Sequence, residues 1–109
     1  MMTAQSIREF FVSHLSRPAR PTDVVSAWDE RVSYSETERS TEAIDARWQG
    51  RRIAEAVWTI GHRGPDAVAV REFASGCASL GVPMAVSLGF LERVMAQYRE
   101  QLSLIADIG

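Results

Sequence analysis

An apolar stripe in the C-terminal part of the chain restricts the fold to helices that pack against one another. Its members recur at alternating steps of four and three residues, which is the a/d spacing of a heptad repeat over three repeats. The stripe predicts a helix over residues 83–107, on the order of 36 Å long at about 1.5 Å per residue. A domain of this size covers such a helix only in part, so some of the stripe is expected to contact another chain. It comprises Met84, Leu88, Leu91, Met95, Tyr98, Leu102 and Ile105.

The remaining sequence predicts a single all-α domain. Its 109 residues are 46% hydrophobic and 24% charged, an ordinary globular composition at a length typical of one domain. Apolar residues recur at helical spacing along the chain, and few segments show the alternating pattern of a strand. We therefore expect a small bundle of four to five helices with a long C-terminal, heptad-patterned helix. The expected parts of this domain, residues 1–109, are an N-terminal helical arm (1–16), an Arg/Pro connector (17–22) and a helical core (23–109).

Local start and stop signals place the individual helices. Ser6 and Glu9 have the spacing of a capping box for the first helix, and the prolines of the connector end that helix. Residues 33–40 are polar and separate the second and third helices, although one continuous helix is the alternative. The expected helices are Ala4–Ser16, a second from Thr22 or Asp23, a third from Thr41 to Gly61 or Gly64, a fourth from Pro65 to Gly81, and a fifth from Pro83.

Charge and hydropathy narrow the classes of partner. The formal net charge is −2, so the chain lacks the excess positive charge that binds nucleic acid. All twelve basic residues are arginine. No secretory signal or run of about 20 apolar residues is present, which excludes a membrane span and predicts a cytoplasmic protein. The expected partner is therefore another protein.

The residue types that carry most enzyme chemistry are few and scattered. His14 and His62 lie in different segments, and neither has metal-ligand spacing to Cys77. Cys77 lies on the apolar side of a predicted helix, which indicates a buried structural thiol. The carboxylates of residues 29–45 alternate with arginines, as on a solvated helical face. We predict no catalytic residue, no metal site and no cofactor, and do not expect an enzyme; a small enzyme is the third and least favoured function.

Residues 70–94 resemble a helix-turn-helix unit, because two predicted helices flank the turn Leu80–Pro83. The resemblance implies a DNA-binding transcriptional regulator as the alternative function. However, residues 83–89, which would face the base edges, have no positive charge and almost no donor or acceptor. The same surface is suited to packing against protein.

Two surfaces are predicted to bind protein. The C-terminal stripe is either buried within its own bundle or forms a symmetric homodimer, and the additional apolar residues of this helix favour the dimer. The expected dimer interface is Leu88, Leu91, Val94, Met95, Tyr98, Leu102 and Ile105. Trp48 lies among polar residues and is the first candidate for a partner-facing anchor, whereas Trp58 is expected in the core. The expected partner-binding residues are Trp48, Arg51, Arg52, Phe10, Phe11 and Trp28.

These features predict a small cytoplasmic regulatory protein that acts by binding another protein. Its size, acidity and apolar helix surface fit a bacterial anti-activator that inhibits or sequesters a transcriptional regulator, or a secretion-type chaperone. No residue motif distinguishes these two possibilities.

Overall fold

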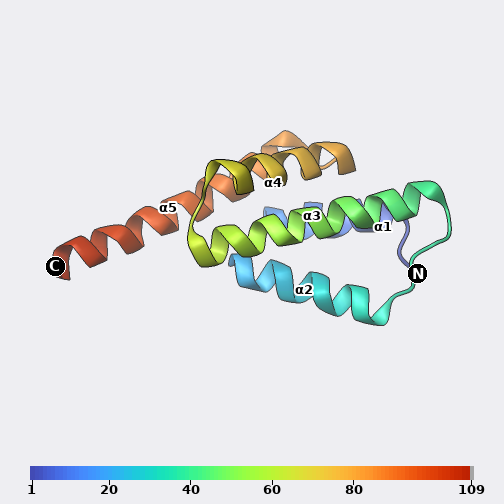
Figure 1. Cartoon of the computed structure of the whole chain (residues 1–109), viewed down its shortest axis with the longest axis horizontal. Helices are drawn as coiled ribbons and strands as arrows, with labels where there is room; N and C mark the ends of the chain where they lie inside the picture. Colours follow the sequence, from blue (N-terminus) through green and yellow to red (C-terminus); the bar gives the residue numbers. More distant parts are fainter. Residues whose placement is uncertain (109) are drawn as a thin grey trace.

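The computed structural model describes residues 1–108, which form five helices joined by short loops (Figure 1). The predicted all-α bundle is confirmed. The second and third helices are separate, because residues 35–40 leave the helical conformation between them. The helices are α1 (Ala4–Ser16), α2 (Pro21–Tyr34), α3 (Thr41–Arg63), α4 (Ala67–Leu80) and α5 (Met84–Ile108).

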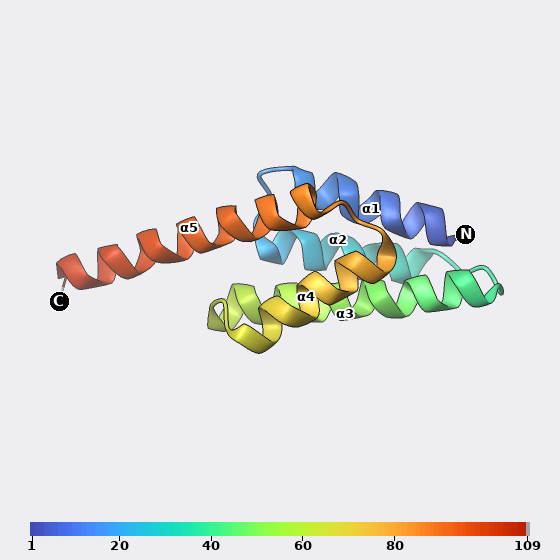
Figure 2. The same cartoon turned by 90° about the horizontal axis from the view of Figure 1, so that it is seen from above.

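Helix α3 is the central element of the bundle. It contacts α1, α2 and α4, while α5 packs against α1 and α4. Both views show the C-terminal part of α5 extending beyond the other helices (Figures 1 and 2). The molecule measures 54 × 25 × 22 Å, and its radius of gyration is 14.6 Å. A compact domain of this length has a radius of gyration of about 13 Å, so the projecting helix accounts for the excess.

The first helix begins with a capping box different from the one expected. The Thr3 hydroxyl accepts a hydrogen bond from the Ser6 amide at 3.0 Å, and the Thr3 amide donates to the Ser6 hydroxyl at 2.8 Å. Ser6 is therefore the third helical residue and not the cap, because the helix begins at Ala4. Glu9 lies one turn further on and accepts from the Gln5 amide group.

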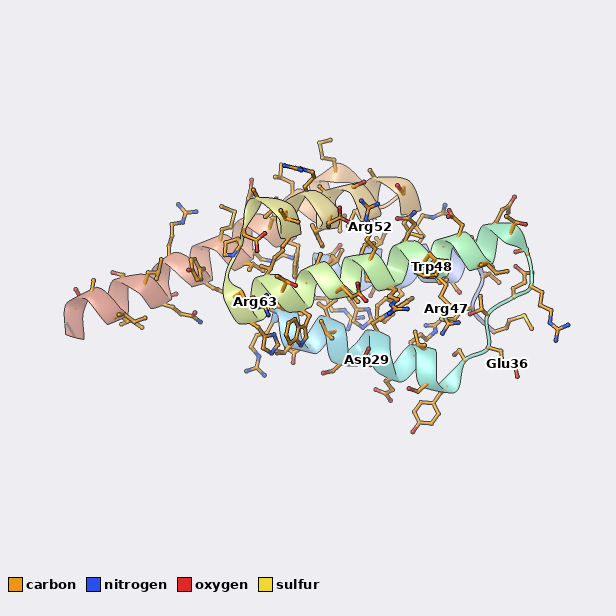
Figure 3. The ribbon with its side chains drawn as sticks, viewed as in Figure 1. Asp29, Glu36, Arg47, Trp48, Arg52 and Arg63 are labelled. Carbon is orange, nitrogen blue, oxygen red and sulfur yellow. The ribbon has the colours of Figure 1, made fainter. Side chains whose placement is uncertain are left out.

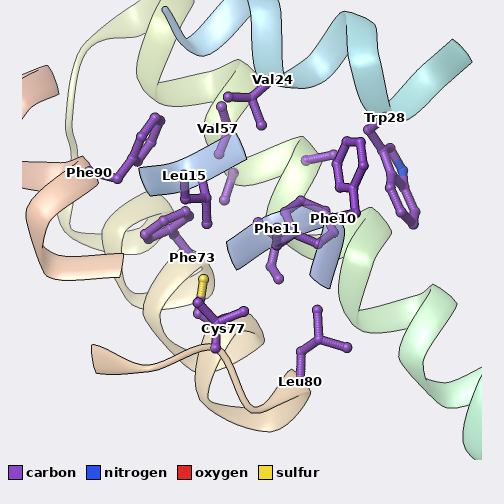
Figure 4. Close-up of a cluster of buried hydrophobic side chains, with 14 of the residues drawn as sticks. Phe10, Phe11, Leu15, Val24, Trp28, Val57, Phe73, Cys77, Leu80 and Phe90 are labelled. Atoms are coloured by element: carbon purple, nitrogen blue, oxygen red, sulfur yellow. The ribbon is translucent and has the colours of Figure 1, made fainter. Parts of the chain in front are cut away.

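The hydrophobic core joins α1 to all the other helices (Figure 4). Phe11 is fully buried, Phe10 is 7% exposed, and both rings contact Trp28 with centroids 5.1 and 5.6 Å apart. Phe73 of α4 and Phe90 of α5 form a second aromatic pair at 5.4 Å. The predicted N-terminal arm is thus a core helix, because residues 17–20 turn the chain back so that α1 packs against α3 and α5. The connector is shorter than predicted, since Pro21 and Thr22 already belong to α2.

Two pairs of hydrogen bonds fix the ends of α1. The chain before it pairs with the α2–α3 loop, where the Met2 amide donates to the Glu36 carbonyl at 2.6 Å and the Met2 carbonyl accepts from Glu38 at 2.9 Å. At its C-terminal end, the Arg93 guanidinium of α5 donates to the carbonyls of Leu15 and Arg17. The first half of α5 is therefore held against the bundle by hydrogen bonds as well as by Phe90.

The expected C-terminal interface is divided between two sides of α5, one buried and one exposed. Leu91 and Val94 are 8% and 6% exposed, so they pack within their own chain and not in a contact with a second one. This differs from the prediction because the first half of α5 turns that side toward α1 and α4. The other expected members remain on the surface: Leu88, Met95, Tyr98, Leu102 and Ile105.

Candidate functional site

A surface groove runs between α2 and α3, with a cavity volume of about 710 Å³. This is within the range of about 300–1,000 Å³ that is typical of binding sites. Its lining combines three tryptophans and several aliphatic side chains with charged groups of both signs. The lining residues are Val25, Trp28, Asp29, Val32, Ser33, Thr37, Ile44, Arg47, Trp48, Arg51, Ala54, Glu55 and Trp58.

The α3 wall of the groove is a stripe of side chains on the face of α3 opposite to its buried residues. Ile44, Trp48 and Trp58 are apolar members with 49%, 63% and 44% of their surface exposed. Arg51 and Glu55 complete steps of four, three, four and three residues, which place all five side chains on one face. The opposite face of α3 carries Ile53, Val57 and Ile60, which are buried. α3 is consequently apolar on two sides, and only one of them is covered.

The α2 wall and the floor are set by a close helix approach. Trp28 is 4% exposed and packs over Gly50, where a Cβ atom would lie 2.5 Å from the ring carbon Cη2. Only glycine lets the indole lie this close to α3. Val25 and Val32 flank Trp28 one turn to either side and are half-buried. The floor is therefore a rigid apolar surface one indole wide.

The exposed indoles are held by neighbours on their own helix. The Trp58 ring stacks on His62 with centroids 4.2 Å apart, and the His62 Nδ1 atom lies 2.8 Å from the Trp58 carbonyl oxygen. The Arg51 guanidinium lies 5.7 Å from the centroid of Trp48, within the range of a cation–π contact. These contacts restrict the rings before any ligand binds, which lowers the entropy cost of binding.

The charges of the groove are only partly paired. Arg51 donates to Glu55 at 3.0 Å across one helical turn, and both side chains are well exposed. Among the described residues, 1–108, neither Asp29 on α2 nor Arg47 on α3 forms an ion pair. Figure 3 shows these two residues on the facing helices, with Trp48 next to Arg47. A ligand would therefore meet one free carboxylate and one free guanidinium.

Arg52, expected to contact a partner, is instead part of the bundle. Its Nε atom donates to Glu72 of α4 at 2.5 Å. This hydrogen bond and the opposite charge lower the pKa of Glu72 and raise the pKa of Arg52. Adjacent residues on a helix point about 100° apart, which explains why Arg51 lies at the groove and Arg52 on the α4 side.

Most of the aromatic residues expected to bind a partner have a different environment in the structure from the one predicted. Phe10 and Phe11 are buried beneath α2 and α3 and have no surface to offer a partner. Trp28 is also buried, although it contributes the groove floor. Trp58, expected in the core, lines the groove, while Trp48 is exposed as the sequence indicated. The four-three spacing of residues 44–58 is the sequence feature that could have identified this face.

The histidines and the cysteine are not brought together. His14 stacks on Phe10 with centroids 4.1 Å apart, and its Nδ1 atom lies 2.9 Å from the Phe10 carbonyl oxygen. Cys77 is 1% exposed, as predicted for a structural thiol, and burial raises its pKa to about 12. Over residues 1–108, no three histidine, cysteine or carboxylate side chains gather in a way that could hold a metal ion.

The α4–α5 turn presents an apolar surface. Gly81 ends α4 in the left-handed conformation, with φ of 88°, and its amide donates to the carbonyls of Cys77 and Ala78. Met84 and Ala85 are exposed in the first turn of α5, and Met84 retains 79% of its surface. Neither side chain can donate a hydrogen bond to a base edge or pair with a phosphate.

Comparisons with known proteins add no relative: no family model matches the chain, nor does any curated protein or solved structure. None of the helices described between residues 1 and 108 has both the length and the apolar character of a membrane span. The groove and the exposed part of α5 are two surfaces of the molecule that are available to a partner.

Proposed function

We propose that this protein is a small cytoplasmic regulatory protein that binds another protein in the α2–α3 groove and thereby inhibits or sequesters it. An anti-activator of a transcriptional regulator or a secretion-type chaperone would act in this way. The observation that supports the proposal is the exposure of Trp48, Trp58 and Ile44 around a preformed cavity of about 710 Å³. Tryptophan and arginine are the residue types most enriched among energetic hot spots of protein interfaces.

The shape of the groove favours a helical ligand. Its α3 wall extends from Ile44 to Trp58, about 21 Å or four helical turns. An amphipathic helix of about 14 residues would cover this length and place side chains from successive turns between the indoles. Its apolar anchors would contact Trp48, Trp58 and the Trp28 floor.

The free charges predict the polar flanks of the ligand. A carboxylate on the bound helix would pair with Arg47 on the α3 side, and a basic side chain would pair with Asp29 on the α2 side. Charges of this kind select the orientation of the ligand and speed its association more than they raise affinity. The proposed ligand is thus an amphipathic helix with an acidic and a basic flank.

The proposal is tested by affinity capture followed by calorimetry. The wild-type protein and the Trp48→Ala and Tyr34→Ala variants are used to capture partners from the native cell, and recovered proteins are quantified by mass spectrometry. Tyr34 is a matched control, because it is 85% exposed but does not line the groove. We expect Trp48→Ala to weaken binding by about 2 kcal/mol, roughly thirtyfold, and Tyr34→Ala to bind like the wild type.

The two variants also give the result that would refute the proposal. Equal affinity of the wild type and Trp48→Ala for the captured partner would exclude the groove as the binding site. Circular dichroism of both variants should retain the wild-type helix content, since both substituted side chains are exposed. A loss of binding can then be attributed to the missing indole and not to unfolding.

A further inference from the structure

We propose that two copies of this chain pair through their α5 helices in antiparallel orientation, about a two-fold axis near Met95. The pairing surface is an exposed stripe on the side of α5 that the bundle leaves open. Leu88, Met95 and Leu102 form this stripe and are 49%, 40% and 47% exposed. They are seven residues apart, so their directions differ by only about 20° from one to the next.

The positions of the stripe are symmetric about its middle residue. A two-fold axis at Met95 places Met95 against Met95 of the second copy. It also places Leu88 against Leu102 of the second copy and Leu102 against Leu88, so that every exposed leucine of the stripe is covered. Interfaces with two-fold symmetry require this self-complementarity, because the same patch serves both subunits.

The charges next to the stripe select the antiparallel orientation. Glu92 and Arg99 are exposed on the same flank, and their midpoint lies within one residue of Met95. Over the described residues, 1–108, neither side chain forms an ion pair. The same two-fold axis brings Glu92 of each copy next to Arg99 of the other, which forms two ion pairs between the copies.

A parallel pair would leave these charges without partners. In parallel coiled coils, residues of one flank face the opposite flank of the second helix. That opposite flank of α5 carries Ser87, Val94 and Gln101, which have no charge. Ser87 and Val94 are moreover buried in their own bundle. Only the antiparallel arrangement uses the open flank of both helices.

The bundle supports the antiparallel arrangement in a second way. The first half of α5 is fixed by Phe90 and by the hydrogen bonds of Arg93 to the end of α1. The second half projects beyond the bundle without cover (Figure 2). Antiparallel pairing lays each projecting half along the fixed half of the other copy. Both unsupported ends would then be covered by the second copy.

The orientation is tested by cross-linking in purified protein. Leu88→Cys and Leu102→Cys are made separately in a Cys77→Ala background and treated with a short bismaleimide linker, alone and mixed. We expect a covalent dimer in the mixture and little from either variant alone, because identical positions are about 21 Å apart along antiparallel helices. Leu104→Cys is the control for random collision, since it is exposed but lies on another side of α5.

The ion pairs are tested by exchanging the charges. Glu92→Arg and Arg99→Glu should each weaken dimerisation by roughly tenfold, measured by sedimentation equilibrium, because each creates two like-charge contacts. The double variant Glu92→Arg/Arg99→Glu should restore dimerisation to near the wild-type level. Such recovery is evidence for contact between the copies, because seven residues separate the two side chains within one helix.

Three results would overturn the proposal. The wild type could sediment as a monomer at tens of micromolar, or each single-cysteine variant could cross-link efficiently by itself, which indicates parallel helices. Leu102→Cys could instead cross-link to Ile44→Cys, which would place the projecting helix in the groove of another copy. The first two results do not bear on the groove, because these experiments use the purified protein without a partner, whereas the third would name α5 of a second copy as the occupant of the groove.

Discussion

Replacing Gly50 by alanine tests the close approach of helices that forms the floor of the groove. A Cβ atom at this position would lie 2.5 Å from Cη2 and 2.8 Å from Cζ2 of Trp28, and 3.2 Å from Cε2 of Phe11. The first two distances are far below van der Waals contact. The indole must therefore tilt into the groove, or α2 must move away from α3. Either movement alters the floor on which the proposed ligand would rest.

Two opposing effects set the size of the change in stability. Overpacking a core position costs about 1–3 kcal/mol. Alanine is favoured over glycine in a helix interior by about 1 kcal/mol. The rings of Phe10 and Phe11 pack against Trp28 and limit its relaxation, so the steric cost should prevail. We expect Gly50→Ala to lower the free energy of unfolding by about 1–2 kcal/mol.

The assay is urea unfolding at neutral pH, followed by circular dichroism and tryptophan fluorescence. Gly89→Ala is the matched control, because a Cβ atom there would meet only the Arg93 guanidinium at 3.5 Å, an ordinary contact. That variant should be more stable than the wild type by up to about 1 kcal/mol, since only the helix preference changes. A Gly50→Ala protein as stable as Gly89→Ala would refute the assigned packing of Trp28 against α3.

Three further predictions concern the bundle. Phe11→Ala should lower the free energy of unfolding by about 3–5 kcal/mol in urea, because Phe11 is fully buried, and a loss below about 1 kcal/mol would contradict its core position. Since Arg52 lowers the pKa of Glu72, their pair stabilises the fold above the usual glutamate pKa of about 4.3. The stability difference between wild type and Glu72→Gln should shrink as pH falls through the lower pKa of the folded state; a difference independent of pH would exclude the pair. Cys77, whose pKa is raised to about 12 by burial, should react with a thiol reagent at pH 8 only after unfolding, and equal rates in water and urea would show an accessible thiol.

The parts of the fold that could be predicted from sequence depend on local interactions. The start of α3 and the ends of α3 and α4 follow from signals close in sequence: the Ser40 hydroxyl accepts from the Ala43 amide, and Gly64 and Gly81 adopt the positive φ that ends a helix. Helix α4 begins two residues later than predicted, because Asp66 caps it. The burial of Cys77 follows from its apolar neighbours one turn away. Such signals do not depend on which helix packs beside them, so periodicity alone finds them.

The candidate site depends on packing between helices, which periodicity does not determine. α3 has apolar residues on two opposite faces, and the sequence pattern does not show which face α1 and α4 cover. Periodicity therefore predicts Trp58 in the core although it lines the groove, and it predicts Arg52 at the partner surface although it pairs with Glu72. Phe10 and Phe11 are buried because the chain reverses after α1 and packs this helix against α3 and α5, which are distant in sequence. Trp48 is exposed, as its polar sequence neighbours indicate, although one of them, Arg52, lies on the α4 side of the helix.

The groove as a protein-binding site is tested most directly by photo-cross-linking in the native cell. A photoreactive phenylalanine analogue is introduced at Ile44, which lines the groove, and separately at Tyr34, which is exposed outside it. We predict a covalent adduct with one other protein from position 44 after irradiation, and none from position 34. Adducts from position 34 alone, or no adduct from position 44 in protein that remains folded, would contradict the assignment of the α2–α3 groove as the binding site.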